Sequence, residues 1–183
     1  MKYRFKRAET EQEFAQIASL NHAVFAAELG QYPTRAENAL IDKFHQKNTY
    51  LVALDGDQLA GMIAVHFEAP YSVAGKMADP SVLDGLGKIA EIRLLAVDPA
   101  YRKSGILGGL LWSVFSYCRE HDTLVVSGRQ EEEKMYRNLG FAPLGPAVAS
   151  GGAMFFPMAA SIPEVAEHAA KWQRRFMRDS SAA

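Results

Sequence analysis

The sequence predicts an α/β (α+β) fold, in which helices flank a sheet, and two stretches carry this prediction. Residues 88–111 read as a buried strand, a tight basic turn with a glycine, and the first turns of an apolar helix. Thr49 to Leu54 and Leu59 to His66 flank Asp55-Gly56, a strong short-range hairpin signal. Neither repeats nor a linker interrupt the chain. We therefore expect a single domain over residues 1–178 and a disordered tail at 179–183.

The composition is that of an ordinary globular domain, with 183 residues, 49% apolar and 22% charged. A net charge of −1 argues against a nucleic-acid-binding protein. No apolar run approaches the ~20 residues that span a bilayer, and the N-terminus lacks the apolar core of a signal peptide. We expect a cytoplasmic protein that is not membrane-bound. Cys118 lies on an apolar helix stripe, and the histidines show no ligand spacing, so we expect no metal.

The first part of the chain reads as one strand and two helices. Tyr3 to Ala8 alternates apolar and basic residues, as a strand does. Thr10 to Glu13 forms a capping box that opens a helix, which should end near Leu29-Gly30. Thr34 is the predicted start of a second helix. This second helix carries Ala39, Leu40 and Phe44.

A long loop precedes the central strand. Residues 67–87 are rich in Ala, Pro, Gly and Ser, and loops of this length are usually functional or disordered. The loop contains Tyr71, Met77 and Leu83, so it could fold over a ligand.

The central strand, Ile89 to Val97, carries two charged residues on one face. Side chains alternate along a strand, which puts Glu91 and Arg93 on the same side. Charged groups in a central strand need a partner or a cleft. The two explanations left open are a mutual ion pair and an active-site face.

The remainder of the chain reads as alternating strands and helices. Thr123 to Ser127 is a short buried strand, and Glu131 to Leu139 is a helix that stops at Gly140. Two closing strands follow, over 141–144 and 153–158. Ser161 to Glu164 is a second capping box. Its helix carries an apolar side, composed of Val165, Ala169, Trp172 and Phe176.

The turn after the central strand has the chemistry of a phosphate site. Arg102-Lys103-Ser104-Gly105 leads directly into the apolar helix. The first N–H groups of a helix lack intrahelical partners, and the helix dipole favours negative charge there.

These features resemble the GNAT superfamily of acyltransferases over most of the chain. The run from Arg102 to Leu107 resembles the family's Q/R-x-x-G-x-G/A pyrophosphate loop. The run Tyr136 to Phe141 resembles its Y-x-x-x-G-F element. The resemblance implies a mixed, mostly antiparallel sheet split around the central strand, and an acyl-CoA donor such as acetyl-CoA. Two positions depart from the pattern: Leu107 stands where the family prefers Gly or Ala, and Arg129 stands where many members place an Asn that touches pantetheine.

A finer likeness concerns the first helix. Val24 to Gly30, which includes Glu28, is similar to the N-acyl amino acid and homoserine-lactone synthase branch, whose members often take longer acyl chains from a carrier protein. By pattern alone, Phe25 and its neighbours are explained equally well as core residues. The donor's chain length, and the choice between CoA and an acyl-carrier protein, therefore stay open.

The resemblance assigns roles to particular residues. Glu91 is the candidate general base and Tyr136 the candidate general acid toward the leaving thiolate. Arg93, Glu28 and Tyr71 are candidate acceptor-binding residues, with a small amine or amino acid as the acceptor. The donor-binding residues are expected on the strand end and the loop: Leu95, Ala96, Val97, Arg102, Lys103, Ser104, Gly105, Ile106, Leu107 and Gly108. A non-catalytic acyl-CoA sensor and a nucleotide-binding protein are the alternatives; the full G-x-G-x-x-G fingerprint that the second needs is not convincingly present.

Overall fold

The computed structural model describes residues 2–168, and these residues form two compact units. Within the described residues, the first unit contains residues 2–65 and 94–114, and the second contains residues 66–93 and 115–168. The strand order is β1-β2-β3-β4-β5-β8-β6, with β7 paired to β8. No helix in the described part of the chain is long and apolar enough to cross a membrane.

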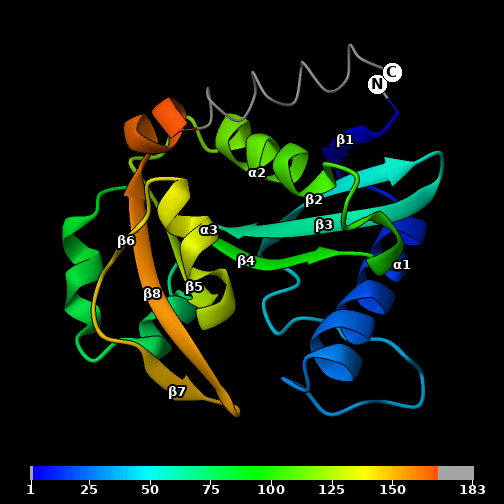
Figure 1. The fold of residues 1–183 in the computed structure, drawn as a ribbon, viewed down its shortest axis with the longest axis horizontal. Coiled ribbons are helices and arrows are strands. Elements are labelled where there is room, and N and C mark those ends of the chain that lie inside the picture. The colour runs from blue at the N-terminus through cyan, green and yellow to red at the C-terminus, as the bar shows by residue number, and fades with distance from the viewer. Residues whose placement is uncertain (1, 169–183) are drawn as a thin grey trace. The chain divides into compact units, whose positions relative to one another are not determined.

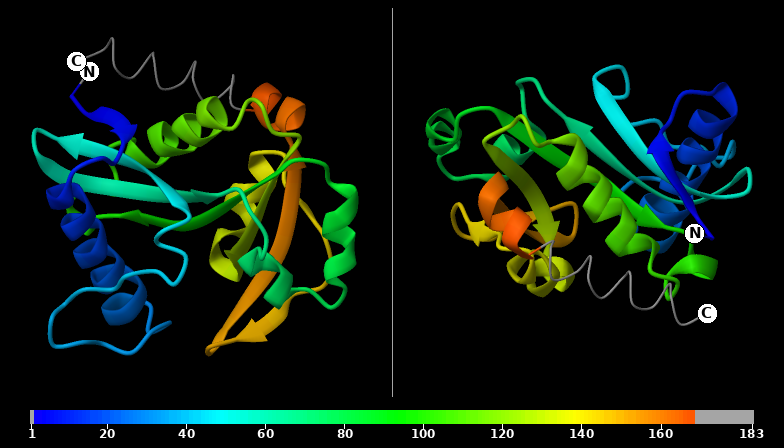
Figure 2. Two further views of the ribbon diagram at one scale, coloured as in Figure 1. Left: turned by 180° about the vertical axis from the view of Figure 1, so that it is seen from behind. Right: turned by 90° about the horizontal axis from the view of Figure 1, so that it is seen from above.

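The first unit pairs a sheet with two main helices. Its elements are β1 (Arg4–Arg7), α1 (Glu11–Asn21), the π-helix η1 (His22–Glu28), β2 (Asn48–Asp55), β3 (Gln58–His66), the second half of β4 (Ile89–Val97), the 3-10 turn η4 (Pro99–Tyr101) and most of α2 (Ile106–Tyr117). Met62 and Ala64 pack with α1, whereas Gly61 faces Ile106 and Leu110 of α2. Neighbouring residues of a strand point to opposite faces, so α1 and α2 cover opposite faces of β3 (Figure 2).

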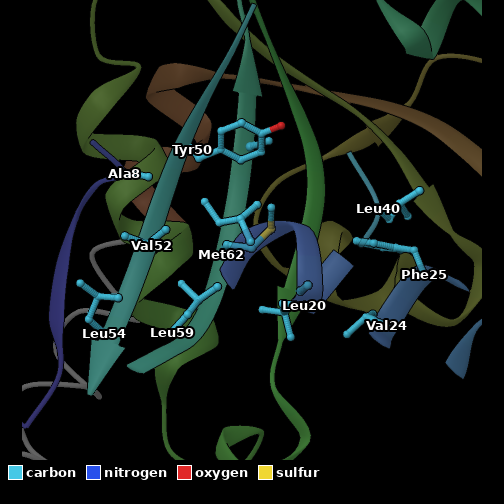
Figure 3. Packing of buried hydrophobic residues seen from close by; sticks show 13 residues of the cluster. Ala8, Leu20, Val24, Phe25, Leu40, Tyr50, Val52, Leu54, Leu59 and Met62 are labelled. Carbon is cyan, nitrogen blue, oxygen red and sulfur yellow. The ribbon is translucent and has the colours of Figure 1, made fainter. Parts of the chain in front are cut away.

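The α1 side of the first unit is a dense apolar core. Figure 3 shows Val52 and Leu54 of β2 and Met62 of β3 packed against Leu20 and Val24. The predicted capping box is confirmed, since the Thr10 side chain accepts from the Glu13 amide and the Glu13 carboxylate accepts from the Thr10 amide. Beyond Asn21 the helix widens into the π-helix, which ends at Leu29-Gly30, where the chain was expected to turn.

The second helix predicted from Thr34 is wrong, because residues 30–47 contain no helix. Their backbone pairs with the first helix instead. The Leu40 amide donates to the Ala18 carbonyl (2.9 Å), and the Arg35 amide donates to His22 Nε2 (3.0 Å). Asn38 has a φ of 50°, outside the helical range. The apolar residue Leu40 is buried as expected, but it packs from an irregular segment.

The second unit is a sheet with different cover on its two faces. Its elements are the 3-10 helices η2 (Ser72–Lys76) and η3 (Pro80–Gly85), the first half of β4, β5 (Thr123–Arg129), η5 (Gln130–Glu132), α3 (Glu133–Asn138), β6 (Ala142–Pro143), β7 (Val148–Ser150), β8 (Ala153–Ser161) and a helical turn at 162–168. In Figures 1 and 2, α3 lies on one face of β5 and β8, and η2 lies on the other. Val73 of η2 is fully buried against Ile89 and Val125.

Most strands and turns follow the predictions. The hairpin around Asp55-Gly56, the central strand, the strand from Thr123 and the second capping box at Ser161 are confirmed. Cys118 is buried, which raises the pKa of its thiol to about 12. The predicted apolar residues Ala169, Trp172 and Phe176 and the tail at 179–183 lie outside the described residues.

Candidate active site

The turn before α2 presents backbone amides to solvent. Gly105 has a φ of 84°, in the region that favours glycine, and residues 102–105 are exposed. The Ser104 amide donates to the Tyr101 carbonyl within the turn (3.0 Å), and the Gly109 amide donates to Gly105 (3.3 Å). The backbone amides of residues 105–108 therefore lie between these two bonds. They come before the Gly109-to-Gly105 bond, the first bond of the i to i−4 series within the helix. They are donors of the kind that bind phosphate at a helix N-terminus.

The residues at and after the turn differ in whether their side chains are buried in the core or exposed to solvent. Ile106 is fully buried and lies on β3 beside Gly61, so only its backbone can contribute to a donor site. Leu107 is half-buried and Gly108 is buried. Lys103 is exposed beside the turn, where its charge favours anions.

Arg102 and Glu28, predicted for different substrates, form one ion pair. The Arg102 guanidinium donates to both oxygens of Glu28, with Nη1 to Oε1 at 2.8 Å and Nη2 to Oε2. Its Nε donates to the Val97 carbonyl (3.3 Å). This contact lowers the pKa of Glu28 and raises that of Arg102. The pair connects the end of the π-helix to the end of β4 and to the turn.

We expect Glu28→Gln to tighten CoA binding by about 2- to 10-fold, because the Glu28 carboxylate opposes an approaching diphosphate and occupies Arg102. Titration calorimetry with CoA at low salt measures this. Glu37→Gln, which removes an exposed carboxylate paired with Arg35, is the matched control. Weaker CoA binding by Glu28→Gln would instead mean that Glu28 holds Arg102 in the binding position.

The end of β4 departs from regular pairing. Its parallel register with β5 runs from Ile89 to Ile92, and Leu94 has a φ of 48°. A leucine in this conformation is strained and marks a local irregularity in the strand. Leu94 and Ala96 pack on the first unit's core. Leu95 and Val97 are half-buried, and they lie beyond Ile92, where the pairing of β4 with β5 ends.

Glu91 is fully buried, and its carboxylate is held by the η2 segment. Oε1 accepts from the Ser72 hydroxyl (2.7 Å) and the Val73 amide (2.6 Å), and Oε2 accepts from the Ser72 amide (2.9 Å). Arg93 Nη1 lies 3.8 Å from Oε2. The loose pair with Arg93 is thus accompanied by three shorter bonds from η2, which neither of the two explanations drawn from the sequence included.

Tyr71 lies at the start of the same segment. Its hydroxyl donates to the Phe67 carbonyl (3.1 Å), and its ring meets the His66 ring edge-on. Burial, and then the charge of Glu91, raise its pKa. The loop that was expected to be functional or disordered is thus an ordered cover on one face of the second unit.

Tyr136 is 2% exposed on α3 and packs edge-on against Phe141. A Cβ added at Gly128 would lie 2.9 Å from the Tyr136 ring, so the glycine makes room for the tyrosine. Within the described residues no hydrogen bond is recorded for the Tyr136 hydroxyl. Burial, and then the charge of Glu132, raise its pKa, so the phenol keeps its proton at neutral pH.

Two supporting residues were not among the sequence candidates. Ser72 supplies two of the bonds to Glu91, and Gly128 fixes the space for the Tyr136 ring. A glycine inside an apolar strand is a recognised sign of close approach, so Gly128 could have been found. Nothing in the sequence marks Ser72, because its partner lies 19 residues away. Among residues 2–168, no three His, Cys, Asp or Glu side chains are grouped as metal ligands.

Comparisons with known proteins concern the family and the fold. The family described as acetyltransferase (GNAT) domain matches residues 5–144. No curated protein sequence matches the chain.

Several solved structures that share the fold carry the name of a synthase, and another is a putative N-acetyltransferase from Lactobacillus plantarum, 16% identical with a TM-score of 0.68, covering 88% of this chain and 99% of its own. FeeM, an N-acyl amino acid synthase from uncultured soil microbes, is 17% identical with a TM-score of 0.72, covering 91% of this chain and 93% of its own. The CoA-dependent acyl-homoserine lactone synthase BjaI, with MTA, is 17% identical with a TM-score of 0.71, covering 89% and 83%. The AHL synthase LasI is 17% identical with a TM-score of 0.70, covering 87% and 89%. At this identity the likeness concerns the fold.

The family match spans most of the chain and contains both the loop at 102–108 and Tyr136, so the chain belongs to the GNAT acetyltransferase family.

Proposed function

We propose that this acyltransferase moves an acyl group from acyl-CoA to a primary amine by direct attack within a ternary complex. The observation that carries the proposal is the turn at Gly105, which opens onto the first amides of α2. Four consecutive amides and the helix dipole match a diphosphate in charge and geometry. Lys103, and the donors of Arg102 that Glu28 does not use, add positive charge.

The end of β4 supplies the second part of donor binding in this proposal. Leu95 to Val97 follow the irregularity at Leu94, beyond the register with β5. The pantetheine arm carries amide groups that pair with such a strand, and the Leu95 amide is the proposed donor to the thioester carbonyl.

The acceptor must lose a proton before it attacks, because an alkylammonium has a pKa near ~10. Glu91 was the predicted base. Since three hydrogen bonds occupy its carboxylate, we assign it the role of fixing the Ser72–Lys76 segment, and we propose that the proton leaves the amine through water.

We propose Tyr136 as the proton donor to the leaving thiolate. Tyr136→Phe keeps the ring packed on Gly128 and removes only the hydroxyl, which has no recorded hydrogen bond within the described residues. We expect kcat to fall by about 100-fold, as for other general acids, with little change in KM or in melting temperature. Steady-state release of CoA measures this. An unchanged kcat would remove Tyr136 from the mechanism.

The experiment that tests the function is CoA release from acetyl-CoA, isopentyl-CoA and a long-chain acyl-CoA with a panel of amines and amino acids. Acyl-carrier protein loaded with the same long chain is the parallel donor. Turnover with an amine confirms the proposal, and the favoured donor defines the chain length. Tight acyl-CoA binding without turnover on any acceptor would contradict it and identify an acyl-CoA sensor.

A further inference from the structure

One face of the second unit carries two buried polar atoms that have no hydrogen-bond partner in the described part of the chain. Within the described residues, Ser127 Oγ and Arg129 Nη1 have no hydrogen bond. Both residues lie on β5, two positions apart, so their side chains share a face of the sheet. Leaving a buried polar group unpaired is destabilising, and native proteins seldom keep two together without a use for them.

The covering element identifies which face this is. Val125 precedes Ser127 by two residues and packs with Val73 of η2. Gly128 points the other way, to Tyr136 of α3. Ser127 and Arg129 therefore lie on the η2 face, the face on which Glu91 is bonded to Ser72.

The neighbouring strand adds apolar surface and a further cation. In the antiparallel register, Phe155 of β8 is opposite Arg129, and Pro157 is opposite Ser127. The Lys76 ammonium lies 4.3 Å from the centre of the Phe155 ring. Cationic groups beside an aromatic ring suit a ligand that combines an anionic group with an apolar side chain.

Arg129 has acidic neighbours, but they occupy other atoms. Glu131 accepts from Nε at 3.2 Å and is 70% exposed, where ion pairs contribute little. Glu132 interacts with the Arg129 backbone amide and with the charge of the Arg129 side chain, but it forms no hydrogen bond with Nη1. Nη1 remains an available donor on a side chain that is only 18% exposed.

We infer that Arg129 and Ser127 bind the carboxylate of the acceptor, so that the acceptors are amino acids. One carboxylate oxygen accepts from Arg129 Nη1 and the other from the Ser127 hydroxyl, a pairing that suits the planar guanidinium. The donor's phosphates are the other source of negative charge, but the amides of 105–108 in the first unit are their proposed partners. This inference rests on the proposed function, because it names that reaction's acceptor class.

The test compares each proteinogenic amino acid with its α-amide, which keeps the amine and the side chain but lacks the negative charge. Acetyl-CoA and the best long-chain donor are used in turn. We expect the wild type to prefer the acid over the amide. In Arg129→Gln, KM for the acid should rise by about 10- to 100-fold. For the amide, kcat and KM should change little, so the preference for the acid over the amide should disappear.

Two further variants separate binding from folding. Ser127→Ala is nearly isosteric and should raise KM for the acid by about 3- to 10-fold without lowering the melting temperature. Arg137→Gln is the matched control, because Arg137 is an exposed arginine on α3 that pairs with Glu133. It should leave both acceptor series unchanged.

Several results would overturn the inference. Equal KM values for acids and amides in the wild type would do so, as would an Arg129→Gln enzyme that keeps the wild-type preference. A loss of CoA affinity in Arg129→Gln, with acceptor KM unchanged, would place Arg129 on the donor instead. If no acceptor is acylated, the proposed function fails; calorimetry of the same acids and amides against wild type and Arg129→Gln then decides the carboxylate site by itself.

Discussion

Replacing Glu91 with glutamine is expected to lower the free energy of unfolding by about 2–4 kcal/mol. The buried carboxylate accepts three hydrogen bonds from Ser72 and Val73, and Arg93 lies beside it. Glutamine keeps the shape but offers one oxygen, so its NH₂ group faces N–H or O–H donors, and the charge near Arg93 is lost. Urea denaturation followed by circular dichroism measures the change.

The same variant separates anchoring from general-base catalysis. If Glu91 anchors the segment, Ser72→Ala should reproduce part of the loss of stability, and the pH dependence of kcat/KM should keep its wild-type shape. Glu68→Gln changes an exposed carboxylate in the same loop and serves as the control. Wild-type stability in Glu91→Gln, combined with a large fall in kcat and a lost acid limb in the pH profile, would identify Glu91 as the base.

Gly109→Ala should destabilise the first unit by about 3 kcal/mol. A Cβ at this position would lie 2.1 Å from the Phe5 ring, so the methyl group cannot be accommodated unless α2 or β1 moves. We expect a fall in melting temperature of about 6–12 °C for a chain of this size, measured by calorimetry. Gly75→Ala, where a Cβ meets nothing within 4 Å, is the control and should melt like the wild type.

A double-mutant cycle checks the cause. In a Phe5→Ala background the ring is absent, so adding Gly109→Ala should cost little. If Gly109→Ala costs the same in both backgrounds, the close contact with Phe5 is not the reason for the instability.

The elements predicted correctly are those with local signals. The hairpin at Asp55-Gly56 and the capping boxes at Thr10 and Ser161 depend on residues within four positions of one another. The central strand is predicted from a run that is apolar except for Glu91 and Arg93, as is typical of a buried strand.

Where the structure differs from the prediction, contacts between residues distant in the sequence are the reason in most places. Residues 30–47 have a helix-like apolar spacing, but the Leu40 amide pairs with Ala18, 22 residues earlier, and that bond competes with a helix. The positive φ of Leu94 occurs at a residue type that disfavours it, so no propensity could indicate it.

The candidate site shows the same division. The loop at 102–108 and Tyr136 could be named from short motifs, since each is local. The partners of Glu91 could not, because spacing gave only Arg93 as a neighbour, whereas three of its bonds come from η2. The pairing of Arg102 with Glu28 spans 74 positions and depends on where the π-helix ends.

The central claim is that the amides of residues 105–108 hold the diphosphate of CoA, and amide NMR of the ¹⁵N-labelled protein tests it most directly. We expect the amide resonances of Gly105, Ile106, Leu107 and Gly108 to shift downfield and saturate as CoA is added, because a hydrogen bond to phosphate deshields the proton. Pantetheine, which lacks the diphosphate, should leave these four resonances in place. Unmoved resonances at 105–108 under saturating CoA, with shifts elsewhere in the chain, would contradict the claim.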